Sequence, residues 1–190
     1  IIKEGNERIT GRLTGYPLPM NNEVNRLHLL SGRQLDLQNS GKVSVLVDPQ
    51  YAQANHLTPG RDIELIADGK KVTLAISGTA TSPEFVYPMK DAGSLFPEPE
   101  RFGILMVSQL QVQQILGLPG QVNQILVDLA PGVDEEETKQ QIEKILAPYG
   151  NITSYPRKDQ SSHVVLQAEL DGIQLFARSI PFMFLSLIHI

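Results

Sequence analysis

The feature that most constrains the fold is a pair of alternating runs on either side of Asp68-Gly69. In "RDIELIADGKKVTLAISGTA", residues 61–80, apolar and polar side chains alternate before and after this dipeptide. Alternation with a period of two is typical of a strand with one buried face. Asp-Gly accepts the positive φ angles that a two-residue hairpin turn requires. The first expected element is therefore a pair of antiparallel strands.

A strand followed by a short helix precedes this hairpin. The run "KVSVLVD" (42–48) is rich in β-branched residues and predicts a strand. Asp48 and Pro49 predict the N-cap and the first position of a helix over 49–57, because an Asp oxygen accepts backbone N–H groups and proline lacks the N–H that would stay unpaired there. Thr58-Pro59-Gly60 marks the end of this helix.

A second strand and helix follow the hairpin. The run "FGILMV" (102–107) is apolar throughout and predicts a strand. Ser108 and Gln111 form a capping box, in which the hydroxyl accepts a backbone N–H of the first turn and the amide reaches back. The helix over 109–116 is expected to end at Gly117, because glycine readily adopts the left-handed conformation of a C-terminal cap.

The last third of the chain continues this alternation. The runs "QVNQILVDLA" (121–130) and "NITSYP" (151–156) predict strands. Between them, an N-cap at Asp134 opens a helix that is expected to end at Pro148 and Gly150. The residues that this helix is expected to bury are Ile142, Ile145 and Leu146.

The first 41 residues carry weaker patterns. Residues 1–15 predict two short strands around a tight turn at Glu4-Gly5-Asn6. Residues 16–41 contain two early prolines and predict only one short element, around Leu27 to Leu30. A hairpin-rich middle and a strand–helix alternation near the end together predict an α+β fold with two subdomains.

The C-terminal segment "IPFMFLSLIHI" (180–190) is apolar apart from a serine and a histidine. As a helix that rises about 1.5 Å per residue, it spans about half of a ~30 Å hydrocarbon core. Upstream, Leu166, Leu170 and Ile173 recur at spacings of four and three, which predicts an amphipathic helix that becomes apolar on all sides. The pattern favours a truncated transmembrane helix, in which Pro181 is tolerated, over a helix docked in a soluble core.

Charge and cysteine content exclude several classes of protein. The chain has 16 basic and 21 acidic residues, a net charge of -5 and no basic cluster longer than a pair, so we expect no nucleic-acid partner. The absence of cysteine excludes disulfide scaffolds, Cys-based zinc sites, iron–sulfur clusters and thiol catalysis. The first ten residues lack an initiator Met and a signal-peptide pattern, so we expect a cut end within a larger polypeptide.

No motif for catalysis, a cofactor or a metal is legible. The sequence lacks a nucleophile elbow, a P-loop and a dinucleotide-binding glycine motif. Asp159, Ser161 and Ser162 imitate a catalytic cluster, but they are better explained as a turn and an N-cap before the last helix. The histidines have no metal-ligand spacing: His28, His56, His163 and His189. We therefore expect no enzyme, no cofactor and no metal.

Several phrases, taken in order, resemble one protein family. They include "GRLTGYP" from Gly11, "NRLHLLSGRQL" from Asn25, "VLVDPQYAQANHLTPGRDIELI" from Val45 and "VNQILVDLAPGVDEEE" from Val122. In this order they resemble the extracytoplasmic core domain of MacB/FtsX-type ABC transporter permeases. The resemblance covers nearly the whole chain, and the order of the phrases is more specific than any single phrase.

The resemblance implies a position between the first and second membrane helices of a four-helix permease. It implies a porter-like βαβαβ subdomain from residues 1–15 with 102–160, and an inserted β-rich subdomain from 16–101. Residues 161–190 are then a stalk helix that runs into a transmembrane helix. In that family a further strand and helix, as well as the first membrane helix, normally precede "GRLTGYP", and we expect this part of the pattern to be missing from the residues given.

The implied function is transport coupling. A separate cytoplasmic ABC ATPase would drive motion through the membrane to this domain on the periplasmic or extracellular side of the inner membrane. The exported substrate would be a lipoprotein, a peptide or a drug, and a periplasmic adaptor is a possible further partner. Leu166, Leu170 and Ile173 are the candidate stalk contacts to a second permease protomer, with packing inside the domain as the alternative.

The competing interpretation is a membrane-tethered extracellular ligand- or partner-binding module, as in FtsX-like signalling to cell-wall enzymes. Such a module needs an apolar contact surface. The candidate is the loop "FVYPMKDAGSLF", with the alternative that this loop packs on its own subdomain. Its candidate contact residues are Phe85, Tyr87, Met89 and Phe96.

Overall fold

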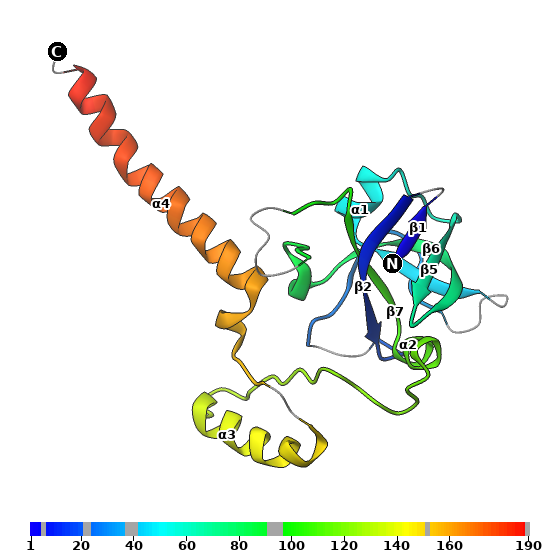
Figure 1. Ribbon diagram of the computed structural model, residues 1–190. Coiled ribbons are helices and arrows are strands. Elements are labelled where there is room, and N and C mark those ends of the chain that lie inside the picture. The colour runs from blue at the N-terminus through cyan, green and yellow to red at the C-terminus, as the bar shows by residue number, and fades with distance from the viewer. Residues whose placement is uncertain (5–6, 21–23, 37–41, 91–96, 151–152, 189–190) are drawn as a thin grey trace. The chain divides into compact units, whose positions relative to one another are not determined.

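The structure is a computed structural model that describes residues 1–4, 7–20, 24–36, 42–90, 97–150 and 153–188. The chain divides into two compact units, residues 1–128 and 129–190. The described strands all belong to the first unit, and the second unit contains the two longest helices. The α+β class and the long C-terminal helix that the sequence predicts are confirmed (Figure 1).

Seven strands form one mixed sheet in the first unit. They are β1 (Ile2–Glu4), β2 (Glu7–Tyr16), β3 (His28–Gly32), β4 (Val43–Val47), β5 (Asp62–Ala67), β6 (Lys70–Thr81) and β7 (Phe102–Ser108). Their order is β3-β6-β4-β7-β2-β1-β5, and β5 pairs in addition with β6. This last pairing closes six strands into a barrel, and β3 pairs with the remaining length of β6. Closure gives both edges of each of these six strands a partner.

The two predicted hairpins are present. β5 and β6 pair with Ala67 opposite Lys70, and the turn residues Asp68 and Gly69 have φ angles of 48° and 72°. β1 and β2 are antiparallel, although the turn residues 5–6 lie outside the described residues. The strands expected at 42–48 and 102–107 are β4 and β7, and the short element expected around Leu27 to Leu30 is the strand β3.

Strand β7 is buried on both faces. Its seven residues are all buried, and successive side chains alternate between two apolar clusters. The first cluster lies inside the barrel and includes Leu105 and Val107. The second cluster lies outside it and contains Phe102, Ile104 and Met106 together with Leu46 and Phe85. Burial on both faces explains why the sequence of this strand is a continuous apolar run.

Two glycines make room for the largest side chains inside the barrel. Gly11 of β2 lies beside Gly103 of β7 in parallel register. A Cβ atom on Gly103 would lie 2.7 Å from the ring carbon Cγ of Tyr51, and one on Gly11 would lie 2.5 Å from Cδ1 of Ile2. Tyr51 and Ile2 are fully buried. The absence of side chains at these two positions therefore lets an aromatic ring and an isoleucine fill a narrow barrel.

Two of the short helices of the first unit, α1 and α2, begin with the predicted caps. The short helices are α1 (Pro49–Ala54), the 3-10 turn η1 (Pro83–Phe85) and α2 (Gln109–Leu116). The Asp48 carboxylate accepts the backbone N–H groups of Gln50 and Tyr51 at 2.9 and 3.0 Å. The Ser108 hydroxyl accepts the N–H of Gln111 at 3.2 Å. Because β4 and β7 are antiparallel, the helices that follow them lie at opposite ends of the barrel (Figure 1).

The second unit contains α3 (Glu135–Leu146), the 3-10 turns η2 (Ala147–Tyr149) and η3 (Arg157–Asp159), and α4 (Ser161–Ile188). The predicted N-cap of α3 is confirmed, because the Asp134 carboxylate accepts the N–H of Glu137 at 2.8 Å. The prediction that α3 buries Ile142, Ile145 and Leu146 is wrong. Ile145 is 66% exposed, the other two are half-buried, and no residue of α3 is buried.

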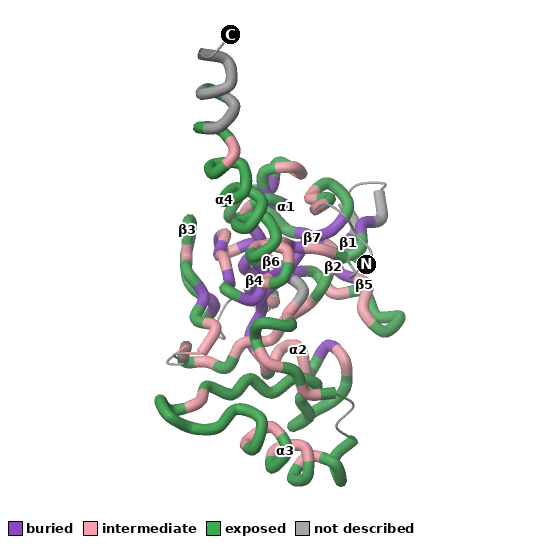
Figure 2. The backbone as a smooth tube through the Cα atoms, turned by 90° about the vertical axis from the view of Figure 1, so that its left-hand side faces the viewer, coloured by how far each residue is buried: buried purple, intermediate pink, exposed green. Residues whose placement is uncertain are grey.

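The strands expected at 121–130 and 151–156 are not formed in the described residues. Residues 121–130 and 153–156 have no strand assignment, and the porter-like βαβαβ pattern is therefore not complete. Val122, Ile125 and Val127 are each more than half exposed. An alternating sequence becomes a strand only when another strand supplies hydrogen bonds, and none of the described strands has 121–130 as a partner. Figure 2 shows the contrast between buried strands and this exposed part of the chain.

The sheet joins strands from both expected subdomains. β4 of the inserted part pairs with β7 of the porter-like part, with Leu46 opposite Met106 and Val47 opposite Leu105. The chain divides into its two compact units after residue 128, whereas the expected boundaries follow residues 15, 101 and 160. The division into porter-like and inserted parts stays a prediction about family organisation.

The glycine pair gives a test of the barrel packing. Gly103→Ala is expected to destabilise the protein by about 1–3 kcal/mol, because the added methyl group overlaps the Tyr51 ring in a closely packed interior. Urea unfolding followed by circular dichroism measures this loss. Gly172→Ala in α4 is the matched control, since a Cβ there meets no atom within 4 Å. Equal unfolding midpoints for Gly103→Ala and wild type would contradict the packing described here.

Candidate functional site

Helix α4 is one continuous element of 28 residues. It begins where the carbonyl of Gln160 accepts the N–H groups of His163 and Val164 at 2.9 and 3.0 Å. It continues past Pro181, two residues after Ser179, whose hydroxyl lies 3.0 Å from the carbonyls of Leu175 and Phe176. None of the described helices combines the length and hydropathy of a membrane span.

One face of α4 is apolar and largely exposed. Of the predicted stalk residues, Leu166 is half-buried, Leu170 is 44% exposed and Ile173 is 65% exposed. The helical spacing places Phe176, which is 66% exposed, on this side as well. A shallow groove on the helix surface is lined by Glu169, Gly172, Ile173, Phe176, Ala177 and Ile180. The sequence interpretation missed Phe176 and Gly172, although both lie within one turn of Ile173.

The predicted contact loop begins as part of the core. Phe85 is buried in the outer apolar cluster, and the guanidinium of Arg12 lies 5.6 Å from the centre of its ring. Tyr87 and Met89 are half-buried, and Phe96 lies outside the described residues. The described part of this loop therefore packs at least partly on its own unit.

A buried carboxylate near this loop connects three segments, and the sequence interpretation did not find it. Glu84 is 8% exposed. One of its oxygens accepts the Gln124 amide at 3.0 Å, and the other accepts the Asn25 amide at 3.4 Å. Its own backbone N–H is bonded to the hydroxyl of Ser82 at 3.3 Å. Glu84 thus holds residues 24–27 and 121–128 against the barrel through side-chain amides.

Two titratable groups in the first unit are perturbed by burial. Burial raises the pKa of the Tyr16 hydroxyl to about 12; the nearby Ser82 side chain acts in the opposite direction, and the Glu84 charge adds a smaller increase. Burial also raises the pKa of Asp48, against the N–H groups of Tyr51 and Gln50 that lower it. The Asp48 carboxylate caps helix α1, so its raised pKa has a structural cause and is not by itself a sign of catalysis.

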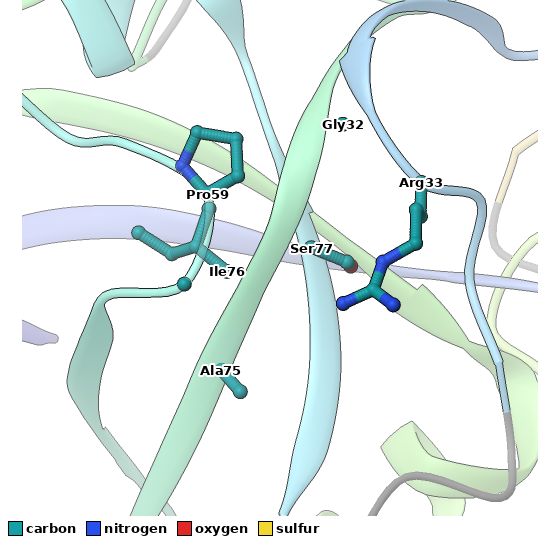
Figure 3. Close-up of a pocket in the computed structure, with 7 residues that line it drawn as sticks. Gly32, Arg33, Pro59, Ala75, Ile76 and Ser77 are labelled. Carbon is teal, nitrogen blue, oxygen red and sulfur yellow. The ribbon is translucent and has the colours of Figure 1, made fainter.

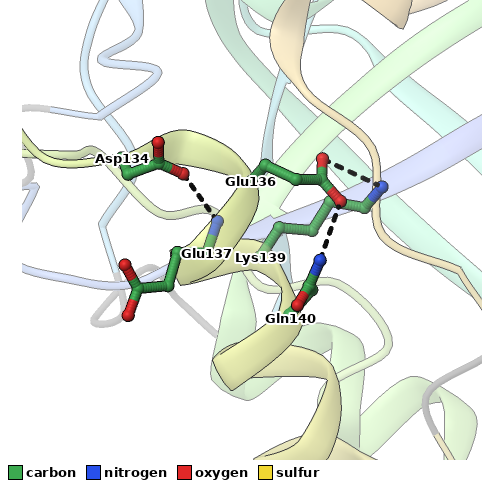
Figure 4. A network of polar contacts seen from close by, with 5 residues as sticks. All are labelled: Asp134, Glu136, Glu137, Lys139 and Gln140. Atoms are coloured by element: carbon green, nitrogen blue, oxygen red, sulfur yellow. Dashed lines mark hydrogen bonds and ion pairs between the residues drawn. The ribbon is translucent and has the colours of Figure 1, made fainter.

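The acidic first turn of α3 is a cap and a solvated face. Lys139 pairs with Glu136 at 4.0 Å, and the Gln140 amide donates to Glu136 at 3.4 Å (Figure 4). Negative charge near a helix N-terminus is stabilised by the helix dipole. Within the described residues no group of three His, Cys, Asp or Glu side chains is placed to hold a metal ion.

The other predicted chemical residues are dispersed. His28 and His56 are exposed and His163 is half-buried, while His189 lies outside the described residues. Asp159 is the last residue of η3, and Ser162 is buried at the start of α4.

Comparison of the chain with protein-family models, curated proteins and solved structures gives no match.

The raised pKa of Tyr16 predicts a pH-dependent stability. The unfolded chain loses the phenol proton near pH 10 and the folded chain near 12, so the stabilisation is complete below pH 10 and is lost between pH 10 and 12. Across this range, the advantage of wild type over Tyr16→Phe is expected to fall by about 1.4 kcal/mol per pH unit.

Urea unfolding at pH 9, 10 and 11 measures this difference. Tyr149→Phe is the matched control, because Tyr149 is 84% exposed and its replacement should leave the pH profile unchanged. Parallel profiles for wild type and Tyr16→Phe would show that the Tyr16 hydroxyl is not coupled to folding.

Proposed function

We propose that this chain is the extracytoplasmic domain of an ABC transporter permease, which transmits ATPase-driven motion across the inner membrane to an exported substrate. The ordered phrases that resemble MacB/FtsX-type permeases motivate the proposal. The structural observation that carries it is the unbroken helix α4, which continues through Pro181 into the apolar C-terminal segment.

A continuous helix suits this role because it moves as one body. Displacement at one end reaches the other end without being absorbed by a loop, as in rigid-body transitions of packed helices. In α4 the hydrogen bonds begin at Gln160 and the helix extends to Ile188. ATP hydrolysis would reside in a separate cytoplasmic ABC ATPase, and this chain would act as a lever without catalytic residues.

The exposed apolar face supports contact with a second permease protomer. Ile173 and Phe176 are each about two-thirds exposed, and apolar area in water is unfavourable by roughly 25 cal/mol per Å². A neighbouring helix seated beside Gly172 would cover this surface, because glycine permits close approach of helices within and near membranes.

Membrane topology tests the location of the domain in the natural protein that contains these 190 residues. A reporter inserted at Gly69, in the exposed turn between β5 and β6, is expected to be active outside the cytoplasm. A second reporter, fused after the apolar segment that includes Ile190, is expected to report the cytoplasm. A cytoplasmic reporter at Gly69 would overturn the proposal.

Transmission is tested by breaking α4. These 190 residues contain no cysteine, so a fluorophore can be attached at Thr73→Cys in the natural permease assembled with its ATPase, once any cysteines elsewhere in the two proteins have been replaced. An ATP-dependent fluorescence change is expected. Pro181 is accommodated in the apolar segment of α4, whereas Ile173→Pro places a second proline in the amphipathic part of the helix. This change should abolish the response, because proline inside a helix costs about 3 kcal/mol and kinks or breaks the helix. Ile173→Ala is the control that keeps the helix.

The outcomes of this experiment separate a lever from a tethered binding module. Loss of the ATP response in Ile173→Pro, with the response kept in Ile173→Ala, supports transmission through α4. An undiminished response in Ile173→Pro would mean that the helix is only a tether.

A further inference from the structure

A cleft opens on the barrel where β6 passes from one neighbouring strand to another. β5 pairs with β6 as far as Asp62 opposite Ala75, and β3 reaches it with Gly32 opposite Gly78. Residues 76 and 77 therefore lie between two strand ends. The cleft has a volume of about 260 Å³ and is lined by Gly32 and Arg33, by Pro59 and Gly60, and by residues 75–77 (Figure 3).

The backbone around this cleft is already hydrogen-bonded. The N–H of Arg33 donates to the Ser77 carbonyl at 2.9 Å, and the N–H of Gly60 donates to the Ile76 carbonyl at 2.7 Å. The Ser77 hydroxyl donates to the Val45 carbonyl at 3.0 Å. Gly32 and Gly60 have φ angles of 81° and 92°, which turn the chain at both strand ends. These bonds hold the lining of the cleft in place. The Ser77 hydroxyl is already bonded to the Val45 carbonyl.

The guanidinium of Arg33 is the cationic group of this cleft. It points toward Ser77 in Figure 3, and it makes no hydrogen bond or ion pair with any described residue. Neighbouring cations are occupied, because Lys42 pairs with Asp62 and Arg61 donates to the His56 carbonyl at 3.1 Å. Arg33 is thus an available fork of N–H donors in a cleft whose lining also includes the exposed Pro59 and the half-buried Ala75.

We propose that this cleft binds a carboxylate carried on a short apolar stem. A guanidinium matches a carboxylate with two parallel N–H···O bonds, which gives direction as well as affinity. The volume is below the roughly 300–1,000 Å³ of sites for drug-sized ligands, so it suits one small group. A free short-chain acid and the C-terminal residue of a peptide both carry this chemistry. The proposal does not depend on the transport function.

Chemical-shift titration of the 15N-labelled 190-residue chain tests the site at pH 7. Isovalerate is expected to give saturable shifts at the amides of Gly32, Arg33 and Gly60, and neutral isovaleramide is expected to give none. Arg33→Gln should weaken isovalerate binding at least tenfold. Arg26→Gln, an exposed arginine outside the cleft lining, should leave it unchanged.

A second pair of probes distinguishes the source of the carboxylate. N-acetyl-Ala-Val with a free C-terminus and its C-terminal amide are compared with isovalerate on the same amides. Tighter binding of the free peptide acid supports a peptide terminus, and tighter binding of isovalerate supports a free acid. Three outcomes would overturn the proposal. They are equal binding of the acid and its amide, the absence of a saturable shift with either acid, and undiminished binding to a well-folded Arg33→Gln variant.

Discussion

The first unit depends on the contact between Gly103 and the ring of Tyr51. A closed barrel of six strands has a small interior, and a ring can enter only where a neighbouring strand lacks a side chain. Gly11 and Gly103, adjacent in register on β2 and β7, create this space. The ring itself is positioned by α1, which the Asp48 cap starts immediately after β4. Strand pairing, helix capping and core filling are therefore one connected arrangement.

Outside the barrel, the segments without strand structure are held by polar side chains. Glu84 accepts amides from Asn25 and Gln124, and it does so while nearly buried. Hydrogen bonds to a charged acceptor stabilise the folded state by about 1.5–3 kcal/mol each. A buried carboxylate without hydrogen-bond partners would strongly destabilise it. This explains how residues 121–128 stay attached to the first unit although their apolar side chains are exposed.

The two proposals concern separate parts of the molecule and rest on different physics. The transmission proposal rests on stiffness, because α4 is an unbroken helix with an apolar face. The carboxylate proposal rests on a guanidinium without a partner among the described residues, at a discontinuity of the sheet where β6 exchanges β5 for β3.

Local chemistry in the sequence determined the α+β class, the turn at Asp68-Gly69 and the caps at Asp48, Ser108 and Asp134. These features depend on neighbouring residues only, so short-range spacing was sufficient to predict them. Tertiary structure alone decided the closure of β5 onto β6, the parallel pairing of β2 with β7 and the absence of a strand at 121–130. It also brought Arg33 to Ser77 and Gln124 to Glu84. Strand partners and these contacts join residues that lie far apart in the chain, and an alternating pattern specifies a face of a strand without specifying its neighbour.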